Sequence, residues 1–182
     1  PFDRFQALTV ANNIINRGGL ISGPAGVGKS KVLHVTRRVL EHMGFKVITC
    51  AYTHCATRLI GGDTIAHLLH LNTQMADTVV LVDEVGLLPL STLGAISRWK
   101  ALGVSFIFFG DYQGQFEPFR DKWNLADLCP EGSPFMAEMT KGLHIRLEKY
   151  RRGTDLGLYK WFFGMYDTEE DLLELVTESR RR

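Results

Sequence analysis

The chain has 182 residues, a length that suits a single domain with a sizeable hydrophobic core. Its composition is typical of globular proteins, with 45% hydrophobic and 23% charged residues. Because 21 basic and 20 acidic residues give a net charge of only +1, overall charge provides no evidence for nucleic-acid binding, and any such contact must come from individual loops.

The cysteines and the N-terminus bear on cellular location. Cys50, Cys55 and Cys129 form no Cys-x-x-Cys pair and no cluster with histidine at ligand spacing, so we expect reduced thiols in an intracellular protein and no zinc site. No apolar run approaches the roughly 20 residues of a membrane span. The first ten residues lack the layout of a signal peptide. Because the sequence does not begin with Met, we expect it to be part of a longer protein.

Helix-like and strand-like segments alternate along the chain. In chain order, the patterns predict a helix at Arg4–Asn16, a strand at Gly19–Gly23, a helix at Lys29–Met43, a strand at Lys46–Thr53, a helix at Thr64–Leu71, a strand at Thr78–Val85, a helix at Ser91–Leu102, and strands at Val104–Asp111 and His144–Lys149. Several strands are nearly continuous apolar runs, which is typical of parallel strands buried on both faces. The alternation predicts an α/β fold with a mainly parallel sheet flanked by helices.

Two stretches are less regular. Residues Glu117–Gly142 carry three prolines and no long period, so we expect an irregular excursion with a short helix near Pro134–Thr140. Near the C-terminus, Thr168 is a suitable N-cap followed by acidic residues, which predicts the start of another helix.

A complete Walker A pattern, GPAGVGKS, follows the first predicted strand. Its glycines allow backbone amides to surround phosphate oxygens, Lys29 can reach the β- and γ-phosphates, and Ser30 can hold Mg²⁺. The next helix points its positive N-terminal end at the same place. The candidate nucleotide-binding residues of this segment are Gly23, Pro24, Ala25, Gly26, Val27, Gly28, Lys29, Ser30 and Lys31.

A second motif, VVLVDEVG, places two carboxylates at the end of an apolar strand. Asp83 can bind Mg²⁺ through its water shell. Glu84 can then orient or deprotonate an attacking water, so the pair favours hydrolysis over phosphoryl transfer to another acceptor.

A third strand end, FIFFGDYQGQFEPF, carries Gln115 four residues after Asp111. A neutral amide at this position can contact the γ-phosphate and respond to its loss, which is the task of a sensor and not of a base. Taken alone, this stretch is equally compatible with a polar loop after a buried strand.

Together, these residues resemble the N-terminal motor domain of superfamily 1 DNA helicases, in the RecD-like and Pif-type branch that includes small phage helicases. The resemblance runs from about Phe2 to Arg152 and rests on Gln6, GPAGVGKS, AYTHCATRL, TIAHLL, VDEVGLLP, GDYQGQFEP and LEKYRR, in that order. It implies a RecA-like lobe that uses ATP and Mg²⁺ and couples ATP hydrolysis to movement on single-stranded DNA and to duplex unwinding.

The resemblance also implies roles for individual residues. Gln6 matches the Q motif, which recognises adenine, and Gln115 matches the glutamine that couples the γ-phosphate to the DNA track. Arg151 matches the motif IV arginine that contacts the γ-phosphate, and Tyr150 is expected to pack near the base. The implied catalytic set is Lys29, Glu84, Gln115 and Arg151, with Ser30 and Asp83 at the metal.

The nucleic-acid contacts are expected from two loops. Hydroxyls and amides at the end of AYTHCATRL, and the segment DTIAHLL, can grip backbone phosphates. The candidates are Thr53, His54, Arg58, Thr64 and His67. Single-strand grooves also use aromatic stacking, for which Tyr52, Tyr112 and Phe116 lie in suitable loops, although each is more often a core residue. Two departures from the family pattern are Tyr52, which replaces proline, and His67, which comes one residue late.

We predict a RecA-like ATPase lobe at residues 1–152 and a helical segment at 153–182 that leads towards a second RecA-like lobe absent from this chain. The chain alone is therefore expected to bind ATP weakly and not to unwind a duplex. Other interpretations remain open: a P-loop kinase or nucleotide-modifying enzyme, a degenerate lobe that only binds nucleic acid, and a superfamily 1 viral RNA helicase. A GTP switch is disfavoured because no Asn-Lys-x-Asp stretch is present.

Overall fold

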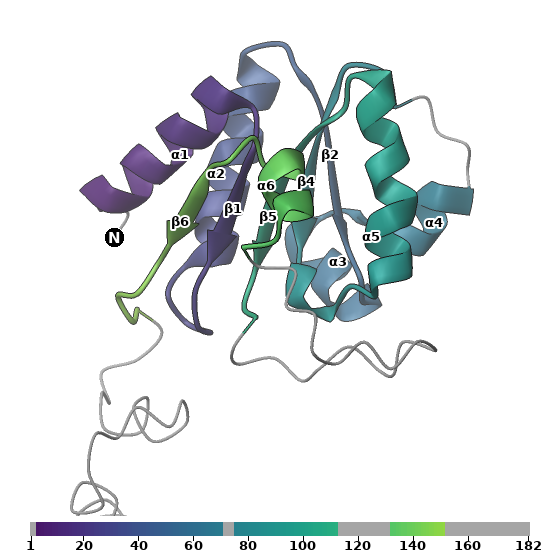
Figure 1. Cartoon of the computed structure of the whole chain (residues 1–182). Helices are drawn as coiled ribbons and strands as arrows, with labels where there is room; N and C mark the ends of the chain where they lie inside the picture. Colours follow the sequence, from purple (N-terminus) through teal and green to yellow (C-terminus); the bar gives the residue numbers. More distant parts are fainter. Residues whose placement is uncertain (1–2, 71–74, 113–131, 152–182) are drawn as a thin grey trace, which may run out of the picture.

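The computed structural model describes residues 3–70, 75–112 and 132–151. Its described part contains a six-stranded sheet in the order β3-β2-β4-β5-β1-β6, in which every pair of neighbours is parallel (Figure 1). The strands are β1 (Gly19–Ser22), β2 (Lys46–Ala51), β3 (Asp63–Thr64), β4 (Thr78–Asp83), β5 (Ser105–Gly110) and β6 (His144–Arg146).

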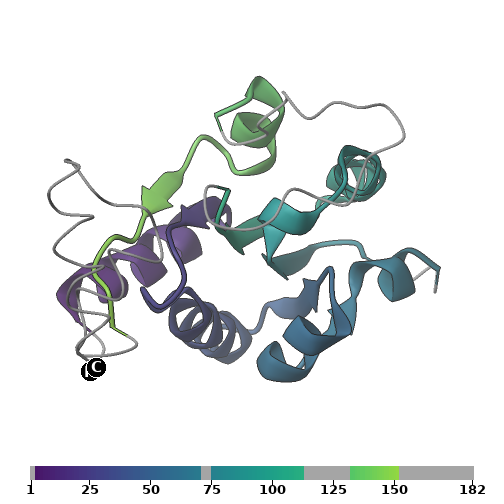
Figure 2. The ribbon, with the colours of Figure 1, turned by 90° about the horizontal axis from the view of Figure 1, so that it is seen from below.

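Helices cover both faces of the sheet. They are α1 (Arg4–Asn16), α2 (Lys29–His42), α3 (His54–Ile60), α4 (Ile65–His70), α5 (Leu90–Ser97) and α6 (Pro134–Met139), with short 3₁₀ segments at Val85–Leu87 and Arg98–Leu102. Viewed from below, α1, α2 and α3 lie on one face, and α5 and α6 lie on the other (Figure 2). The result is a three-layer α/β/α arrangement.

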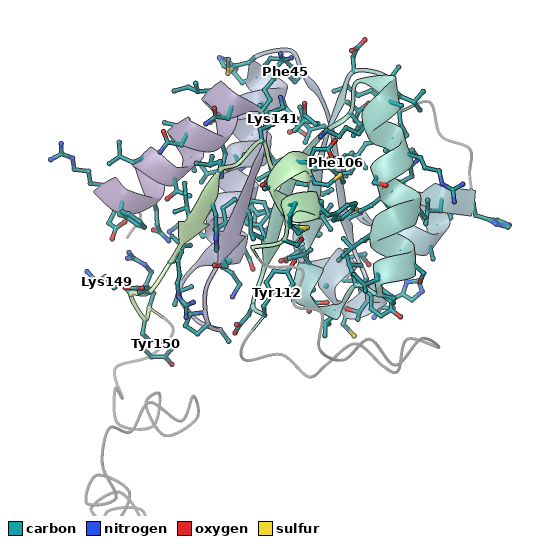
Figure 3. The ribbon with its side chains drawn as sticks, viewed as in Figure 1. Phe45, Phe106, Tyr112, Lys141, Lys149 and Tyr150 are labelled. Atoms are coloured by element: carbon teal, nitrogen blue, oxygen red, sulfur yellow. The ribbon has the colours of Figure 1, made fainter. Side chains whose placement is uncertain are left out.

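The sheet is apolar on both sides, and each face has its own hydrophobic core. All six residues of β4 are buried, as expected for a central parallel strand. The core under α1, α2 and α3 includes Ile21, Leu33 and Leu81. The opposite core includes Phe106 and Phe108, whose stacked rings lie 5.5 Å apart between centroids; Phe106 is labelled in Figure 3. This packing fixes the strands that carry the site.

The predicted α/β class and parallel sheet are confirmed, as is the short helix near Pro134–Thr140. Helix α1 has the predicted bounds. The prediction of one helix over Ser91–Leu102 is corrected, because α5 ends at Ser97 and continues as a 3₁₀ turn. The sequence interpretation missed α3 and β3, which are too short, at seven and two residues, to show a clear period. Phe116, Thr168 and residues 153–182 lie outside the described residues.

The following observations on membrane spans, cysteines and metal ligands apply to the described residues only. No helix within them is long and apolar enough to cross a membrane. Within the same ranges Cys50 is buried and Cys55 exposed, both as free thiols, and no group of three metal-ligating side chains occurs. Cys129 lies outside the described residues.

Candidate nucleotide-binding and hydrolysis site

The candidate site lies at the edge of the sheet where the parallel strands end. Ser22 of β1 pairs with Gly110 of β5, and Ala51 of β2 pairs with Asp83 of β4. Because neighbouring strands end in register, the glycine-rich loop, the two carboxylates at the end of β4 and the end of β2 meet at one edge. Ligands bind at this edge in open parallel sheets.

The loop from Gly23 to Gly28 depends on glycine at two points. A Cβ on Gly23 would lie 2.2 Å from the backbone oxygen of Leu147, just after β6. Gly28 has φ of +96°, in the left-handed region, and a Cβ there would lie 2.5 Å from Nε2 of Gln6. The loop therefore packs against β6 on one side and against α1 on the other.

Lys29 begins α2 and turns its side chain back over the loop. Its Nζ donates to the backbone oxygens of Gly23 at 2.5 Å and Pro24 at 2.9 Å. Burial lowers the pKa of Lys29, and the nearby carboxylates of Asp111 and Asp83 oppose that shift. Weak carbonyl partners thus hold a buried ammonium group, which suits a group that binds phosphate.

Asp83 is the last residue of β4 and is 8% exposed. Burial raises the pKa of its carboxyl group, a shift that a hydrogen bond from the Glu84 amide opposes. That amide donates to Oδ1 of Asp83 at 2.9 Å. A buried carboxylate beside Lys29 is a suitable oxygen donor for a hard divalent cation.

Glu84 follows Asp83 in an unusual backbone conformation. Its φ of 54° and ψ of 39° lie in the left-handed region, which non-glycine residues seldom adopt. Its carboxylate Oε2 accepts a hydrogen bond from the hydroxyl of Thr53 at 2.9 Å. The amide of Glu84 donates to Asp83 and its carboxylate accepts from Thr53, so hydrogen bonds hold the residue at both ends. Strained backbone that is held in this way often marks functional sites.

On the α1 side of the loop, Gln6 is 1% exposed. It forms a capping box with Asp3, whose side chain accepts from the Gln6 amide at 2.9 Å. Nε2 of Gln6 is buried and has no hydrogen-bond partner among the described residues. An unpaired buried donor is costly, so this amide is suited to a ligand acceptor above Gly28.

Arg151, the last of the described residues, also lies on the α1 side of the glycine-rich loop. Its amide donates to the backbone oxygen of Gly26 at 2.9 Å, and its guanidinium Nη2 donates to the carboxylate of Asp3. The capping bond from Gln6 and the bond from Arg151 hold the pKa of Asp3 below its usual range. Nε of Arg151 is buried and unpaired within the described ranges. The guanidinium thus points towards the start of α1.

The candidate nucleic-acid residues lie around α3 and α4. Thr53 caps α3 by accepting from the amide of Ala56, while His54 and Arg58 are exposed on that helix. Thr64 is buried, and its hydroxyl accepts from the amide of His67. The exposed His67 ring lies 3.1 Å from a carboxylate oxygen of Asp63. The structure places Thr53 at the N-cap of α3 and His54 and Arg58 on the same helix, and it gives the Thr64 hydroxyl a local capping bond.

The remaining predicted residues are placed as follows. Ser30 and Lys31 are exposed in the first turn of α2. Tyr112 and Tyr150 lie towards the lower end of the molecule, below β5 and β6 (Figure 3). Gln115 lies outside the described residues. Sequence reasoning missed Asp3, for which the N-cap pattern Asp-x-x-Gln was an available signal, and Asp111, whose place after β5 was visible in the sequence.

A family model described as an AAA domain matches residues 5–148. The chain belongs to the AAA domain family. No match was found among curated proteins.

Solved structures similar to this AAA domain include Pif1 helicases. The Pif1 helicase from Candida albicans matches with a TM-score of 0.71 and 16% identity, over 96% of this chain and 47% of that one. Bacteroides Pif1 bound to ssDNA matches with a TM-score of 0.68 and 20% identity, over 98% and 49%. Bacteroides Pif1 in complex with ADP-AlF3 and ssDNA matches with a TM-score of 0.67 and 21% identity, over 94% and 48%. The chain thus shares their fold and spans about half their length.

Proposed function

We propose that this AAA domain is the N-terminal motor lobe of an ATP-dependent translocase or helicase that moves on single-stranded DNA. The observation that carries the proposal is the meeting of Lys29, Asp83 and Glu84 at the edge of a sheet whose fold matches Pif1 helicases, among them structures bound to ssDNA and to ADP-AlF3. Membership of the AAA domain family supports nucleotide use.

The residues on the page fit ATP with Mg²⁺. Within the described residues Lys29 donates to two loop carbonyls and can turn to the phosphates, while Nε2 of Gln6, which has no partner in the same ranges, lies on the α1 side of the loop. Asp83 and the Ser30 hydroxyl supply oxygen donors for Mg²⁺, which neutralises charge on the phosphates when bound. Glu84 is placed to accept a proton from the attacking water.

The second half of the motor is proposed to lie outside this chain. The chain covers 47–49% of the Pif1 structures, as expected for one of two lobes. Arg151 and Gln115 are proposed to report the γ-phosphate to the DNA track, with His54 and Arg58 as phosphate contacts on α3. Residues 1–152 are proposed as this lobe. We also propose that the protein is intracellular.

The test is ATP hydrolysis by the full-length protein that contains this chain, with and without single-stranded DNA. We expect stimulation by DNA and a loss of about 100-fold or more in Lys29→Ala, since removal of one transition-state donor costs about that much. Single-stranded RNA serves as a parallel arm for an RNA translocase. Turnover that neither nucleic acid changes would contradict the proposal and favour a P-loop kinase or another nucleotide-using enzyme.

A further inference from the structure

The hydroxyl of Thr53 lies at the junction between two candidate regions. Two residues after β2 ends, it donates to Oε2 of Glu84 at 2.9 Å, and its oxygen accepts from the amide of Ala56 at 3.2 Å. The pairing of Ala51 with Asp83 brings the two strand ends together, which explains why residues 31 positions apart meet.

We propose that Thr53 is a positioning residue for Glu84 in ATP hydrolysis and not a contact to the nucleic-acid backbone. This inference rests on the proposed function, since it requires Glu84 to act on water. It reassigns a residue that the resemblance places among the nucleic-acid contacts.

The chemistry of a hydroxyl group supports this assignment. A threonine side chain has one hydrogen to donate. In the structure Glu84 receives that hydrogen, while one lone pair accepts the amide that begins α3. Phosphate oxygens are acceptors only, so Thr53 cannot bind phosphate while it donates to Glu84. His54 and Arg58, exposed on the same helix, offer donors that leave this bond intact.

Glu84 is a residue whose orientation needs such support. Its backbone is in the left-handed region, and its amide donates to Asp83, so the backbone direction is set at one end. The carboxylate is set at the other end by Thr53, which engages Oε2. A general base needs only one oxygen to accept the proton. With Oε2 held by Thr53, the planar shape of the carboxylate group sets the direction of Oε1, which can accept that proton. Misplacement by about 1 Å can cost about 100-fold in rate.

The experiment separates the two bonds of the hydroxyl by substitution in the full-length protein. Thr53→Ser retains the donor and the cap. Thr53→Gly largely retains the cap, since Gly is about as favourable as Thr at an N-cap, but has no side chain to donate to Glu84. Thr53→Val loses both. Thr57→Val is the matched control, because the Thr57 hydroxyl donates to the backbone oxygen of His54 in the same helix.

Steady-state ATP hydrolysis at saturating single-stranded DNA, DNA affinity and melting temperature are measured for each variant. We expect Thr53→Gly and Thr53→Val to lower kcat by about 10- to 100-fold, with the KM for ATP and the Kd for DNA within about twofold of the unsubstituted protein. Thr53→Ser is expected to stay within about threefold in kcat, and Thr57→Val likewise, because the geometry at Glu84 is kept.

Three results would overturn the inference. In the first, Thr53→Gly keeps the full kcat, which assigns the hydroxyl to capping alone. In the second, Thr53→Val weakens DNA binding while kcat at saturating DNA is unchanged, which makes Thr53 a phosphate contact. In the third, the unsubstituted protein does not hydrolyse ATP, which removes the proposed function as well. ATP hydrolysis without DNA stimulation contradicts only the translocase, and basal kcat then tests Thr53 in the same way.

Discussion

The two sides of the glycine-rich loop differ in how their polar groups are paired. On the β4 side, comprising Lys29, Thr53, Asp83 and Glu84, hydrogen bonds link the key groups to one another or to the loop. The α1 side comprises Asp3, Gln6 and Arg151. There, Nε2 of Gln6 and Nε of Arg151 are buried without partners within the described part of the chain.

This difference predicts that the two sides of the loop affect different quantities, kcat and ATP affinity. Groups that are already oriented need no rearrangement when a substrate arrives, which is what a fast chemical step requires. Buried donors without partners gain most from a ligand that supplies acceptors. We therefore expect substitutions on the β4 side to change mainly kcat and substitutions on the α1 side to change mainly ATP affinity.

The largest effect is expected for Glu84→Gln. The substitution keeps the shape and the acceptor oxygen for Thr53 but removes the base, so kcat should fall by about 100- to 1,000-fold. Affinity for ATP should stay within about twofold, because the phosphate-binding groups are unchanged. Steady-state hydrolysis and titration with a fluorescent ATP analogue measure the two quantities. A raised KM with normal kcat would contradict the expectation that the β4 side affects mainly kcat.

Gln6→Met tests the α1 side. The apolar side chain fills a similar volume but offers no donor, so we expect ATP to bind about 10-fold more weakly, the loss of roughly one hydrogen bond. The kcat at saturating ATP should be unchanged. Nε2 has no partner among the described residues, so its loss should not lower the melting temperature, whereas the loss of Oε1, which accepts from the Asp3 amide at 3.4 Å in the capping box, should lower it slightly. A loss of affinity for ATP but not for GTP would assign Gln6 to recognition of the adenine base.

Asp3 allows capping to be separated from its ion pair with Arg151. Asp3→Asn keeps an acceptor for the Gln6 amide, whereas Asp3→Ala removes both functions. Both variants should raise the KM for ATP by only about threefold, since a partly exposed ion pair contributes little. Only Asp3→Ala should lower the free energy of unfolding, because it also removes the N-cap acceptor of α1. Chemical denaturation distinguishes them, and equal stability loss in both would contradict the capping role.

The smallest effect is a pH-dependent gain in stability for Asp83→Asn. Burial raises the pKa of Asp83 in the folded protein above its ordinary value of 3.8. The folded state therefore holds this proton more tightly than the unfolded state, and stability is lost as the pH rises through the folded pKa. Relative to the unsubstituted protein, Asp83→Asn should gain nothing below about pH 3.8 and gain stability above it.

Denaturation measured across the acidic range checks this sign. A stability difference that shrinks as the pH rises would show that the carboxylate of Asp83 is stabilised by its surroundings.

The fold could be predicted from the sequence because its strands are nearly continuous apolar runs and its glycine-rich loop follows the first of them. Lys29, Asp83 and Glu84 were identified because each occupies a fixed place after a strand. The Thr53–Glu84 bond was not predictable from spacing, since it depends on the register of β2 against β4. The Asp3–Arg151 pair joins residues 148 positions apart, and only the path of the chain past β6 brings them together.

Both outer strands of the sheet have a consequence for association between molecules. β3 contains two residues and β6 three, and their side chains include Asp63, His144 and Arg146. A strand at the margin of a sheet is a template on which another polypeptide can add by backbone pairing, and short, charged strands resist such addition. The described sheet therefore offers little backbone at either margin for edge-to-edge aggregation, although its centre is almost entirely apolar.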